Sequence, residues 1–254
     1  MKAVLVGSGN VATHLAFAVK AAGIEVAQIW SKRMENAKIL AVQVGADAID
    51  NISGIDQEAD FCILSIKDDA ISNVISELKG FKGVVLHTSG SVNLGVFGDD
   101  FEKYGVLYPL QTFSIKKEVN FKTIPICIEA NTSNTLKIIS QLAEKLSDKV
   151  VEINSEKRKI LHLAAVFACN FTNHLYTLSE DLVANHDMDF DMLRPLILET
   201  ALKVQHSSPK DVQTGPAIRN DEQTIKKHEE LLLNQPQLLT IYQTLSESIK
   251  KTKK

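Results

Sequence analysis

The sequence predicts an α/β protein in which a doubly wound, mostly parallel sheet is followed by a smaller all-helical domain. Three observations support this prediction. Short apolar runs alternate with amphipathic segments as far as Ile153. A glycine-rich turn directly follows the first apolar run. Beyond Ile153 only helical patterns continue, so strands and helices separate into two parts of the chain.

The strands and helices of the first part are expected where the period of apolar residues changes. Seven strands are predicted at Lys2–Val6, Glu25–Trp30, Phe61–Ser65, Gly83–His87, Gly105–Tyr108, Ile124–Glu129 and Val150–Ile153. Four helices are predicted at Asn10–Ala22, Met34–Val44, Ile71–Leu78 and Ser133–Leu146. The segment Phe113–Phe121 has neither period, and we expect a loop there.

The second part reads as helices alone, with a boundary between residues 154 and 155. This gives a dinucleotide-binding domain at 1–154 and a helical substrate and dimerisation domain at 155–254. The predicted helices are Ser155–His186, one capped by Asp189 or Asp191 that runs to His206, one capped by Asn220 with Gln223 as capping-box partner that runs to Leu233, and one from Pro236 to Lys250.

The composition narrows the classes of protein. Of the 254 residues, 44% are hydrophobic and 23% are charged, which is typical of a globular protein with a core. The net charge of −3 gives no basic field for nucleic acid. The apolar stretch from Ile160 to Leu178 contains histidines and asparagines, so we interpret it as a buried helix and expect no membrane contact.

The start of the chain and its cysteines suggest a cytoplasmic protein. The first strand pattern begins at Lys2, so we expect no signal peptide. Cys62, Cys127 and Cys169 are widely separated in apolar surroundings, as reduced core thiols of a cytoplasmic protein would be. No Cys/His spacing resembles a metal site, and none is predicted.

The run Gly7-Ser8-Gly9-Asn10-Val11-Ala12 between the first strand and the first helix resembles the dinucleotide-binding turn of Rossmann-like domains. Gly7 allows the tight turn, and Gly9 lets the backbone approach a pyrophosphate. The helix N-terminus would supply N–H groups and the positive end of its dipole. Gly7, Ser8, Gly9, Asn10 and Val11 are therefore predicted cofactor residues. The alternative is a glycine-rich turn with no ligand.

The end of the second strand indicates which nucleotide binds. A site selective for NAD usually has an acid about 20 residues past the glycines, where it binds the ribose 2′-OH. This sequence instead has Ser31-Lys32-Arg33 there. A hydroxyl and two cations suit the 2′-phosphate of NADP. The alternative is a solvated helix start, although cations at that position oppose the helix dipole.

Two further strands end in polar residues at the same edge of the predicted sheet. Ser65 and Ile66 are expected to contact the ribose or pyrophosphate, while Asp68 and Asp69 can cap the next helix. The run His87-Thr88-Ser89-Gly90-Ser91 could hold the nicotinamide or a substrate, and His87 could transfer a proton. Equally, Ser89-Gly90-Ser91 could be an ordinary turn.

The long helix predicted from Ser155 carries both apolar and polar signals. It is apolar on nearly every side from Ile160, which predicts burial against a second copy of the chain. His162, Asn170, Asn173 and His174 fall on an arc of roughly 120° at the α-helical period. This arc could line a substrate cleft, form hydrogen bonds in the core or face solvent. Arg219 could bind an anionic substrate group or pair with a neighbouring acid.

Together these motifs resemble a bacterial family of proposed NADP oxidoreductases, which join a Rossmann-like domain to a helical domain of unknown function. The resemblance covers nearly the whole chain. Its motifs are the glycine turn, His87-Thr88-Ser89-Gly90, Tyr108-Pro109-Leu110-Gln111-Thr112-Phe113, the helix with His162 and Asn170, and Gly215-Pro216-Ala217-Ile218-Arg219-Asn220-Asp221. The family has glycine where this chain has Asn220, and asparagine also tolerates positive φ. The wider superfamily includes pyrroline-5-carboxylate reductase, prephenate dehydrogenase, deazaflavin-dependent NADP reductase and 6-phosphogluconate dehydrogenase-like enzymes.

The resemblance implies a fold and NADP as cofactor, but it implies no substrate. We predict an oxidoreductase whose small-molecule substrate lies near His87, Tyr108, His162 and Asn170. His87, His162 and Asn170 are the predicted catalytic residues. Ser89, Tyr108 and Arg219 are the predicted substrate-binding residues. The alternative function is a non-catalytic, dimeric NADP-binding sensor.

Overall fold

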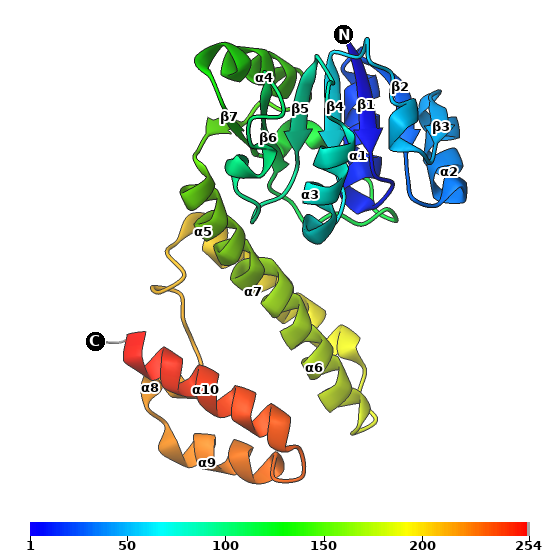
Figure 1. Cartoon of the computed structure of the whole chain (residues 1–254). Helices are drawn as coiled ribbons and strands as arrows, with labels where there is room; N and C mark the ends of the chain where they lie inside the picture. The colour runs from blue at the N-terminus through cyan, green and yellow to red at the C-terminus, as the bar shows by residue number, and fades with distance from the viewer. Residues whose placement is uncertain (253–254) are drawn as a thin grey trace. The chain divides into compact units, whose positions relative to one another are not determined.

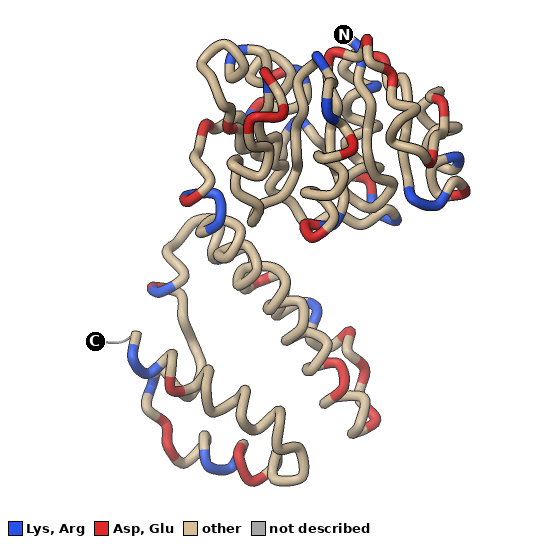
Figure 2. Tube along the Cα trace, in the orientation of Figure 1, with Lys and Arg blue, Asp and Glu red and all other residues tan. Residues whose placement is uncertain are grey.

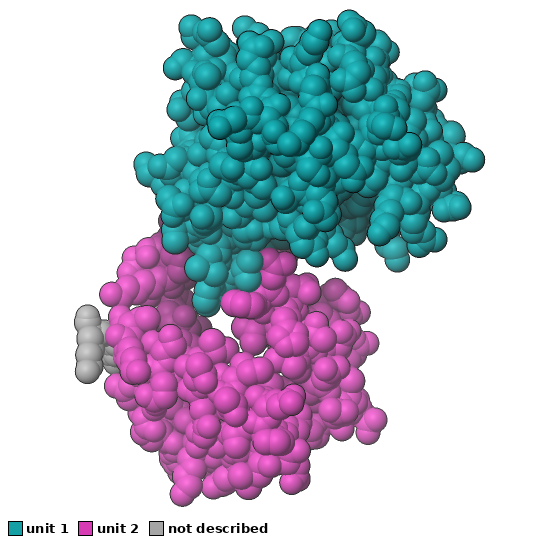
Figure 3. Space-filling view, viewed as in Figure 1, with its two compact units in different colours: residues 1–169 teal, residues 170–254 magenta. Residues whose placement is uncertain are grey.

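The computed structural model describes residues 1–252, which form two compact units (Figures 1 and 3). One unit comprises residues 1–169 and the other residues 170–254, of which the last two lie outside the described part. The predicted domain boundary at 154/155 marks where strands give way to helices, and it stays a prediction. In the structure the last strand ends at Glu152 and the next helix begins at Ser155, within the first unit.

A single eight-stranded sheet forms the centre of the first unit. The strands are β1 (Lys2–Val6), β2 (Glu25–Trp30), β3 (Asp47–Ile49), β4 (Phe61–Leu64), β5 (Val84–His87), β6 (Tyr104–Pro109), β7 (Ile126–Ala130) and β8 (Val150–Glu152). Their order is β3-β2-β1-β4-β5-β6-β7-β8. Every neighbouring pair is parallel except β6 and β7. The predicted doubly wound, mostly parallel sheet is confirmed, and β3 is the strand that the sequence pattern missed.

Helices cover both faces of this sheet: α1 (Asn10–Ala21), α2 (Met34–Val44) and α4 (Ser133–Leu146) on one, and α3 (Asp68–Glu77) on the other. The helix α5 (Ser155–Ala165) follows β8, and short 3₁₀ turns lie at η1 (Ile52–Gly54), η2 (Leu94–Phe97) and η3 (Phe121–Thr123). The segment expected to be a loop from Phe113 has no helix or strand before η3.

The core consists of two apolar layers, because side chains alternate across each strand. Ala3 and Leu5 of β1 pack with the buried faces of α1, α2 and α4. Val4 and Val6 of the same strand pack with α3 and η2 on the other face. All four side chains are fully buried. A strand buried on both faces must be apolar throughout, which explains the continuous run in the sequence.

The register of the sheet brings the ends of its central strands together. Val6 pairs with Trp30 of β2 and with Leu64 of β4, and Leu64 pairs with His87 of β5. The polar residues that follow these strands therefore lie side by side at one edge. Ligands of open α/β sheets bind at the carboxyl ends of strands, so the candidate site is expected there.

All regular elements among the described residues of the second unit are helices, joined by loops. It contains α6 (Thr172–Ala184), η5 (Phe190–Met192), α7 (Arg194–His206), α8 (Pro216–Arg219), α9 (Glu222–Leu231) and α10 (Pro236–Thr252). The predicted uninterrupted helix from Ser155 to His186 is wrong in one respect: residues Val166–Phe171 (η4) are a π-helix between α5 and α6. A π-helix has more residues per turn than an α-helix. The predicted arc of His162, Asn170, Asn173 and His174 therefore does not hold across it.

The start of α9 also differs from the prediction. Asn220 does not cap this helix; Asp221 does, since its side chain accepts hydrogen bonds from the Thr224 backbone N–H at 3.1 Å and from the Thr224 hydroxyl at 2.8 Å. Asn220 instead has φ 54° and ends α8 in the left-handed conformation. Asparagine thus adopts the positive φ expected of the glycine that the family has there.

Charge and cysteine placement complete the description. Basic and acidic residues are scattered over both units (Figure 2), in keeping with the net charge of −3. Cys62 and Cys127 are buried, as expected, whereas Cys169 is exposed, which corrects the prediction for that thiol. Within residues 1–252 no helix combines the length and apolarity needed to cross a membrane.

Candidate functional site

A cavity of about 920 Å³ opens at the carboxyl edge of the sheet in the first unit. It lies over the ends of β1, β2, β4 and β6 and the turn after β5. The predicted cofactor residues that line it are Gly7, Ser8, Gly9, Asn10, Val11, Ser31, Lys32, Arg33, Ser65 and Ile66. The structure therefore brings together all ten residues that the sequence grouped by motif.

Gly7 and Gly9 occupy different environments in the turn. Gly7 has φ 129°, and a Cβ there would lie 2.2 Å from the Ser65 carbonyl oxygen. Its N–H donates to the Trp30 carbonyl at 2.8 Å. Gly9 has an ordinary extended backbone, with φ −82°, and a Cβ there would meet no atom within 4 Å. Gly7 is thus required by the fold, whereas the space in front of Gly9 is open.

The segment after β2 presents cations to the cavity. The Ser8 hydroxyl donates to the Ser31 hydroxyl at 3.0 Å, which joins this segment to the glycine turn. Lys32 and Arg33 are exposed, and neither forms an ion pair among residues 1–252. Arg33 is the N-cap of α2 without a side-chain capping bond. Positive charge at a helix N-terminus is unfavourable on its own, so a bound anion would stabilise it.

Trp30 is a cavity residue that the sequence analysis did not select. Its indole Nε1 is buried and lacks a hydrogen-bond partner among the described residues. A buried indole N–H normally has a partner. Its position as the last residue of β2, directly before the cationic segment, was the signal that could have found it.

At the other end of the cavity, Tyr108 and His162 form a pair. The Tyr108 hydroxyl lies 3.0 Å from His162 Nδ1, and the two rings meet edge to face. Burial raises the pKa of Tyr108 to about 12, so its phenol stays protonated at neutral pH. The sequence predicted both residues but not this hydrogen bond, because they are 54 residues apart.

Gly90 forms the surface on which His162 lies. A Cβ at position 90 would lie 2.6 Å from His162 Nδ1 and 2.7 Å from its Cγ. The imidazole ring therefore packs directly against the backbone of the turn after β5. The sequence motif included Gly90, but only the structure shows that a residue of α5 packs against it.

The hydroxyls of this turn are largely used within it. The Ser89 hydroxyl accepts from the backbone N–H groups of Ser91 at 3.1 Å and Val92 at 3.0 Å. The Ser91 hydroxyl donates to Asp68, the first residue of α3. These bonds favour the interpretation of Ser89-Gly90-Ser91 as a structured turn, although Ser89 also lines the cavity. Asp68 also lines the cavity, although the sequence suggested only that it caps the following helix.

His87 does not line the cavity. Its ring is fully buried, stacks on Phe97 with centroids 5.6 Å apart, and accepts from the Ser89 N–H at Nδ1. Burial, with a smaller contribution from the Arg158 guanidinium, lowers the pKa of His87 to about 3. The position gives no support to the predicted proton transfer by His87. A histidine at a strand end can point into the core as readily as out of it, and the sequence does not distinguish these cases.

Two predicted residues belong to the second unit. Asn170 is an exposed residue of η4, and Arg219 ends α8. Neither is among the residues that line the cavity of the first unit. Arg219 makes a small contribution to lowering the pKa of Asp221, after the hydrogen bonds from Thr224.

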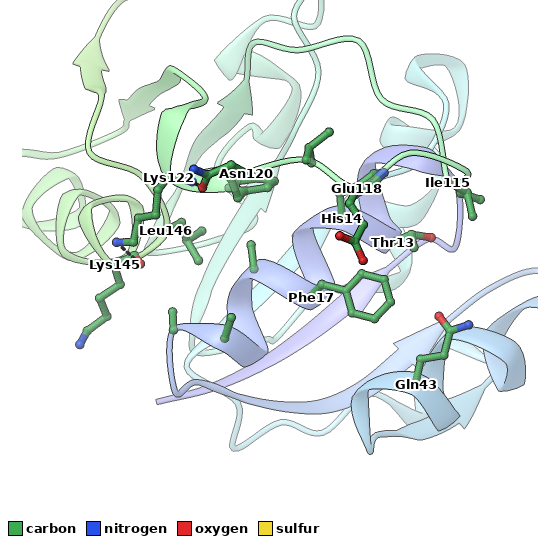
Figure 4. A pocket seen from close by; sticks show the side chains of 15 residues that line it. Thr13, His14, Phe17, Gln43, Ile115, Glu118, Asn120, Lys122, Lys145 and Leu146 are labelled. Atoms are coloured by element: carbon green, nitrogen blue, oxygen red, sulfur yellow. Dashed lines mark hydrogen bonds between the residues drawn. The ribbon is translucent and has the colours of Figure 1, made fainter.

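A second cavity in the first unit lies between α1 and the segment 115–122 (Figure 4). His14 of α1 lines it, and the Nε2 atom of this histidine lies 2.9 Å from the Ser114 carbonyl oxygen. Phe17 also lines the cavity and is exposed. None of the predicted site residues lines this cavity. Elsewhere in residues 1–252, no group of three His, Cys, Asp or Glu side chains is placed to hold a metal ion.

Comparison with known proteins gives the family. Residues 2–86 match the family described as coenzyme F420-dependent NADP oxidoreductase, and residues 124–249 match a domain of unknown function, DUF2520. A proposed NADP oxidoreductase from Bacteroides fragilis is 41% identical over 98% of each chain, with a TM-score of 0.94. The chain belongs to this NADP oxidoreductase family. NADP is the family's cofactor, as the sequence predicted.

More distant structures share the fold of this oxidoreductase. A protein from Thermotoga maritima is 24% identical over 99% of this chain and 98% of its own, with a TM-score of 0.74. A pyrroline-5-carboxylate reductase from Streptococcus pyogenes is 14% identical over the same shares of the two chains, with a TM-score of 0.66. No curated protein matches the sequence.

The two glycines of the turn provide a test of the cavity. Gly9→Ala should leave the melting temperature almost unchanged, because its Cβ meets no protein atom. If the pyrophosphate approaches this backbone, the same methyl group should weaken NADPH binding by about tenfold or more, equivalent to about 1.4 kcal/mol. Calorimetric titration and thermal unfolding measure the two effects. Gly7→Ala is the matched control and should destabilise the fold itself. An unchanged NADPH affinity in Gly9→Ala would show that the pyrophosphate does not bind at this turn.

Burial of His87 predicts a pH dependence of stability. The pKa of His87 is about 3 in the folded protein, against an ordinary value of 6.5. Between pH 3 and pH 6.5, therefore, His87 binds a proton in the unfolded chain but not in the folded one. The free energy of unfolding should therefore fall as the pH drops below 6.5, by up to about 1.4 kcal/mol per pH unit from this group. His87→Asn keeps an acceptor for Ser89 and does not titrate. Urea unfolding from pH 7 to pH 4.5 should show a shallower loss in this variant. Equal slopes for the two proteins would mean that His87 is not held neutral.

Proposed function

We propose that the protein transfers hydride between NADP(H) and a small molecule, with nucleotide and substrate both bound in the cavity at the sheet edge. Family membership supplies the reaction class. The observation that carries the proposal is the content of this one cavity: an open glycine turn, unpaired cations and a Tyr–His pair.

The residues of the cavity fit NADP by three independent criteria. The close approach at Gly7 shapes a turn whose helix N-terminus suits a pyrophosphate. Lys32 and Arg33 suit the 2′-phosphate, since Arg33 can form a fork of two hydrogen bonds. The indole N–H of Trp30 would gain a partner. When bound, NADP(H) supplies or accepts the hydride.

Tyr108 and His162 are the groups we assign to the accompanying proton. When His162 carries a proton on both ring nitrogens, its Nδ1–H donates to the Tyr108 oxygen and its Nε2–H can pass a proton to a substrate atom, which leaves a neutral imidazole. Tyr108 keeps its own proton at neutral pH, so its neutral oxygen can accept from Nδ1 and orient the ring before and after the transfer. Asn170 stays a prediction as a catalytic residue, and Ser89 and Arg219 stay predictions as substrate-binding residues.

The reaction class is tested by NADPH oxidation with a panel of imines, keto acids and hydroxy acids. An oxidoreductase should consume NADPH with at least one class, and His162→Asn should reduce that turnover by about 10²-fold while NADPH affinity is kept. Tyr108→Phe should reduce it less, because the ring loses only its orienting partner. A protein that binds NADPH and oxidises none of the panel would instead fit the sensor alternative.

The choice of nucleotide is tested at Arg33. Arg33→Ala should weaken NADPH binding by roughly tenfold to a hundredfold, since a charge-assisted hydrogen bond contributes about 1.5–3 kcal/mol. NADH binding should hardly change. Lys38→Ala is the control, because Lys38 is an exposed cation of the same helix that does not line the cavity. Equal affinities of the unmodified protein for NADPH and NADH would contradict the assignment.

We also propose a homodimer formed through the helical domain, and a cytoplasmic location suited to three free cysteines. Large apolar side chains are exposed on the long helices: Ile160 and Leu163 on α5, and Leu196, Leu198 and Leu202 on α7. Exposed fractions of 49% to 68% on these residues leave much apolar surface in water. A second copy of the chain would remove it from solvent.

Light scattering at micromolar concentration measures the assembly. We expect a dimer of the 28.0 kDa chain. Introducing charge with Leu196→Glu and Leu198→Glu together should yield a folded monomer. Val42→Glu is the control, because Val42 is 83% exposed on α2, outside the helical domain. A monomeric unmodified protein would disprove the dimer.

A further inference from the structure

Arg158 is the largest fully buried side chain of the described structure, and it lies one helical turn before His162 on α5. Its guanidinium forms an ion pair with Glu129 of β7 through Nη1. Through Nη2 it donates to the Val92 carbonyl at 2.5 Å and to the Ser155 hydroxyl at 3.2 Å. One side chain thus contacts a strand, a loop and the start of its own helix.

Ser155 completes this network at the first residue of α5. Its backbone N–H donates to one Glu129 oxygen at 2.9 Å, and its hydroxyl donates to the other at 2.8 Å. The Leu94 N–H donates to the same hydroxyl at 2.9 Å. The first turn of α5 is therefore bonded both to β7 and to the segment that follows β5.

The segment that follows β5 also contains Gly90, on which the His162 ring lies. Residues four apart lie on the same face of a helix, so fixing Arg158 fixes the direction in which His162 points. Val92 is two residues beyond Gly90, on which the imidazole ring lies. The network is therefore bonded both to α5 near His162 and to the turn near Gly90, the two sides of this contact.

The energetic cost of the network argues for a role beyond holding the helix. A buried ion pair gains little stability over well-packed apolar residues, because both charges lose their hydration. Here the Arg158 Nε also lacks a partner among the described residues. What such a pair can provide is a unique register, since its hydrogen bonds form in only one arrangement.

We propose that Arg158 is a positioning residue: with Glu129 and Ser155 it sets the rotation of α5 that places the His162 ring against Gly90 and within hydrogen-bond distance of Tyr108. The catalytic consequence rests on the proposed function of His162. The geometric consequence does not, and it can be measured without a substrate.

The experiment is ¹⁵N NMR of the protein labelled at histidine, with the His162 signals assigned by their absence in His162→Asn. Tyr108→Phe gives the reference shift for loss of the hydrogen bond to Nδ1. Arg158→Met should move the Nδ1 signal most of the way to that reference. Ser147→Ala is the control, since it removes a buried hydroxyl bonded to Ile124 and Lys149, away from His162, and should leave the signal in place.

A second variant keeps the test decisive if Arg158→Met does not fold. Glu129→Gln together with Arg158→Met leaves no unpaired buried charge and should fold, yet it should show the same shift of the His162 signal. An unchanged Nδ1 signal in either folded variant would overturn the proposal. Once a substrate is found, Arg158→Met should lower kcat by about tenfold or more with NADPH affinity unchanged. Absence of any substrate would disprove the proposed function and leave the NMR result standing.

Discussion

The close approach of the chain at Gly7 is the constraint on which the first unit depends. The turn after β1 passes so near the Ser65 carbonyl that no side chain fits between them. This contact holds the end of β1 against the end of β4, three residues before α1 begins at Asn10. The cavity is the space that remains above these strand ends. Its position therefore follows from a backbone contact, before any cofactor or substrate contributes.

The chemical character of the cavity changes from one end to the other. The end near β2 has exposed cations and open backbone, which suit a multiply charged nucleotide. The end near β6 has a buried phenol, an imidazole and a glycine, with the phenol kept protonated by burial. In the proposed function these two ends would serve different steps: the exposed cations would bind the anionic nucleotide, and the Tyr108–His162 pair would take part in proton transfer.

Much of the fold was predictable because strands and helices each produce a recognisable pattern of apolar residues over a short stretch of sequence. Buried parallel strands need continuous apolar runs. Four predicted elements begin and end where the structure has them, namely Lys2–Val6, Glu25–Trp30, Met34–Val44 and Ser133–Leu146, and the helix predicted from Asn10 begins at that residue. β3 was missed because three residues are too few to show a period. The π-helix was missed because its extra residue per turn leaves no mark on an apolar segment.

The candidate site was predictable only in part, because only some of its residues are close together in the sequence. The residues of the glycine turn and of Ser31-Lys32-Arg33 are adjacent in sequence, so their motif is visible. The pair of Tyr108 with His162, and that of Glu129 with Arg158, join residues far apart in the chain. His87 shows the reverse error: a residue type suited to catalysis lies in the core, stacked on a phenylalanine.

The contact between Gly90 and His162 also constrains how this family can vary. Because the imidazole occupies the volume that any side chain at position 90 would need, the two positions cannot change independently. A relative with alanine or a larger residue at the position of Gly90 must have a smaller residue at that of His162, or a displaced helix. Such a relative would also lose the partner of its tyrosine. Glycine at one position thus marks the sequences that can retain the same imidazole contact at the other.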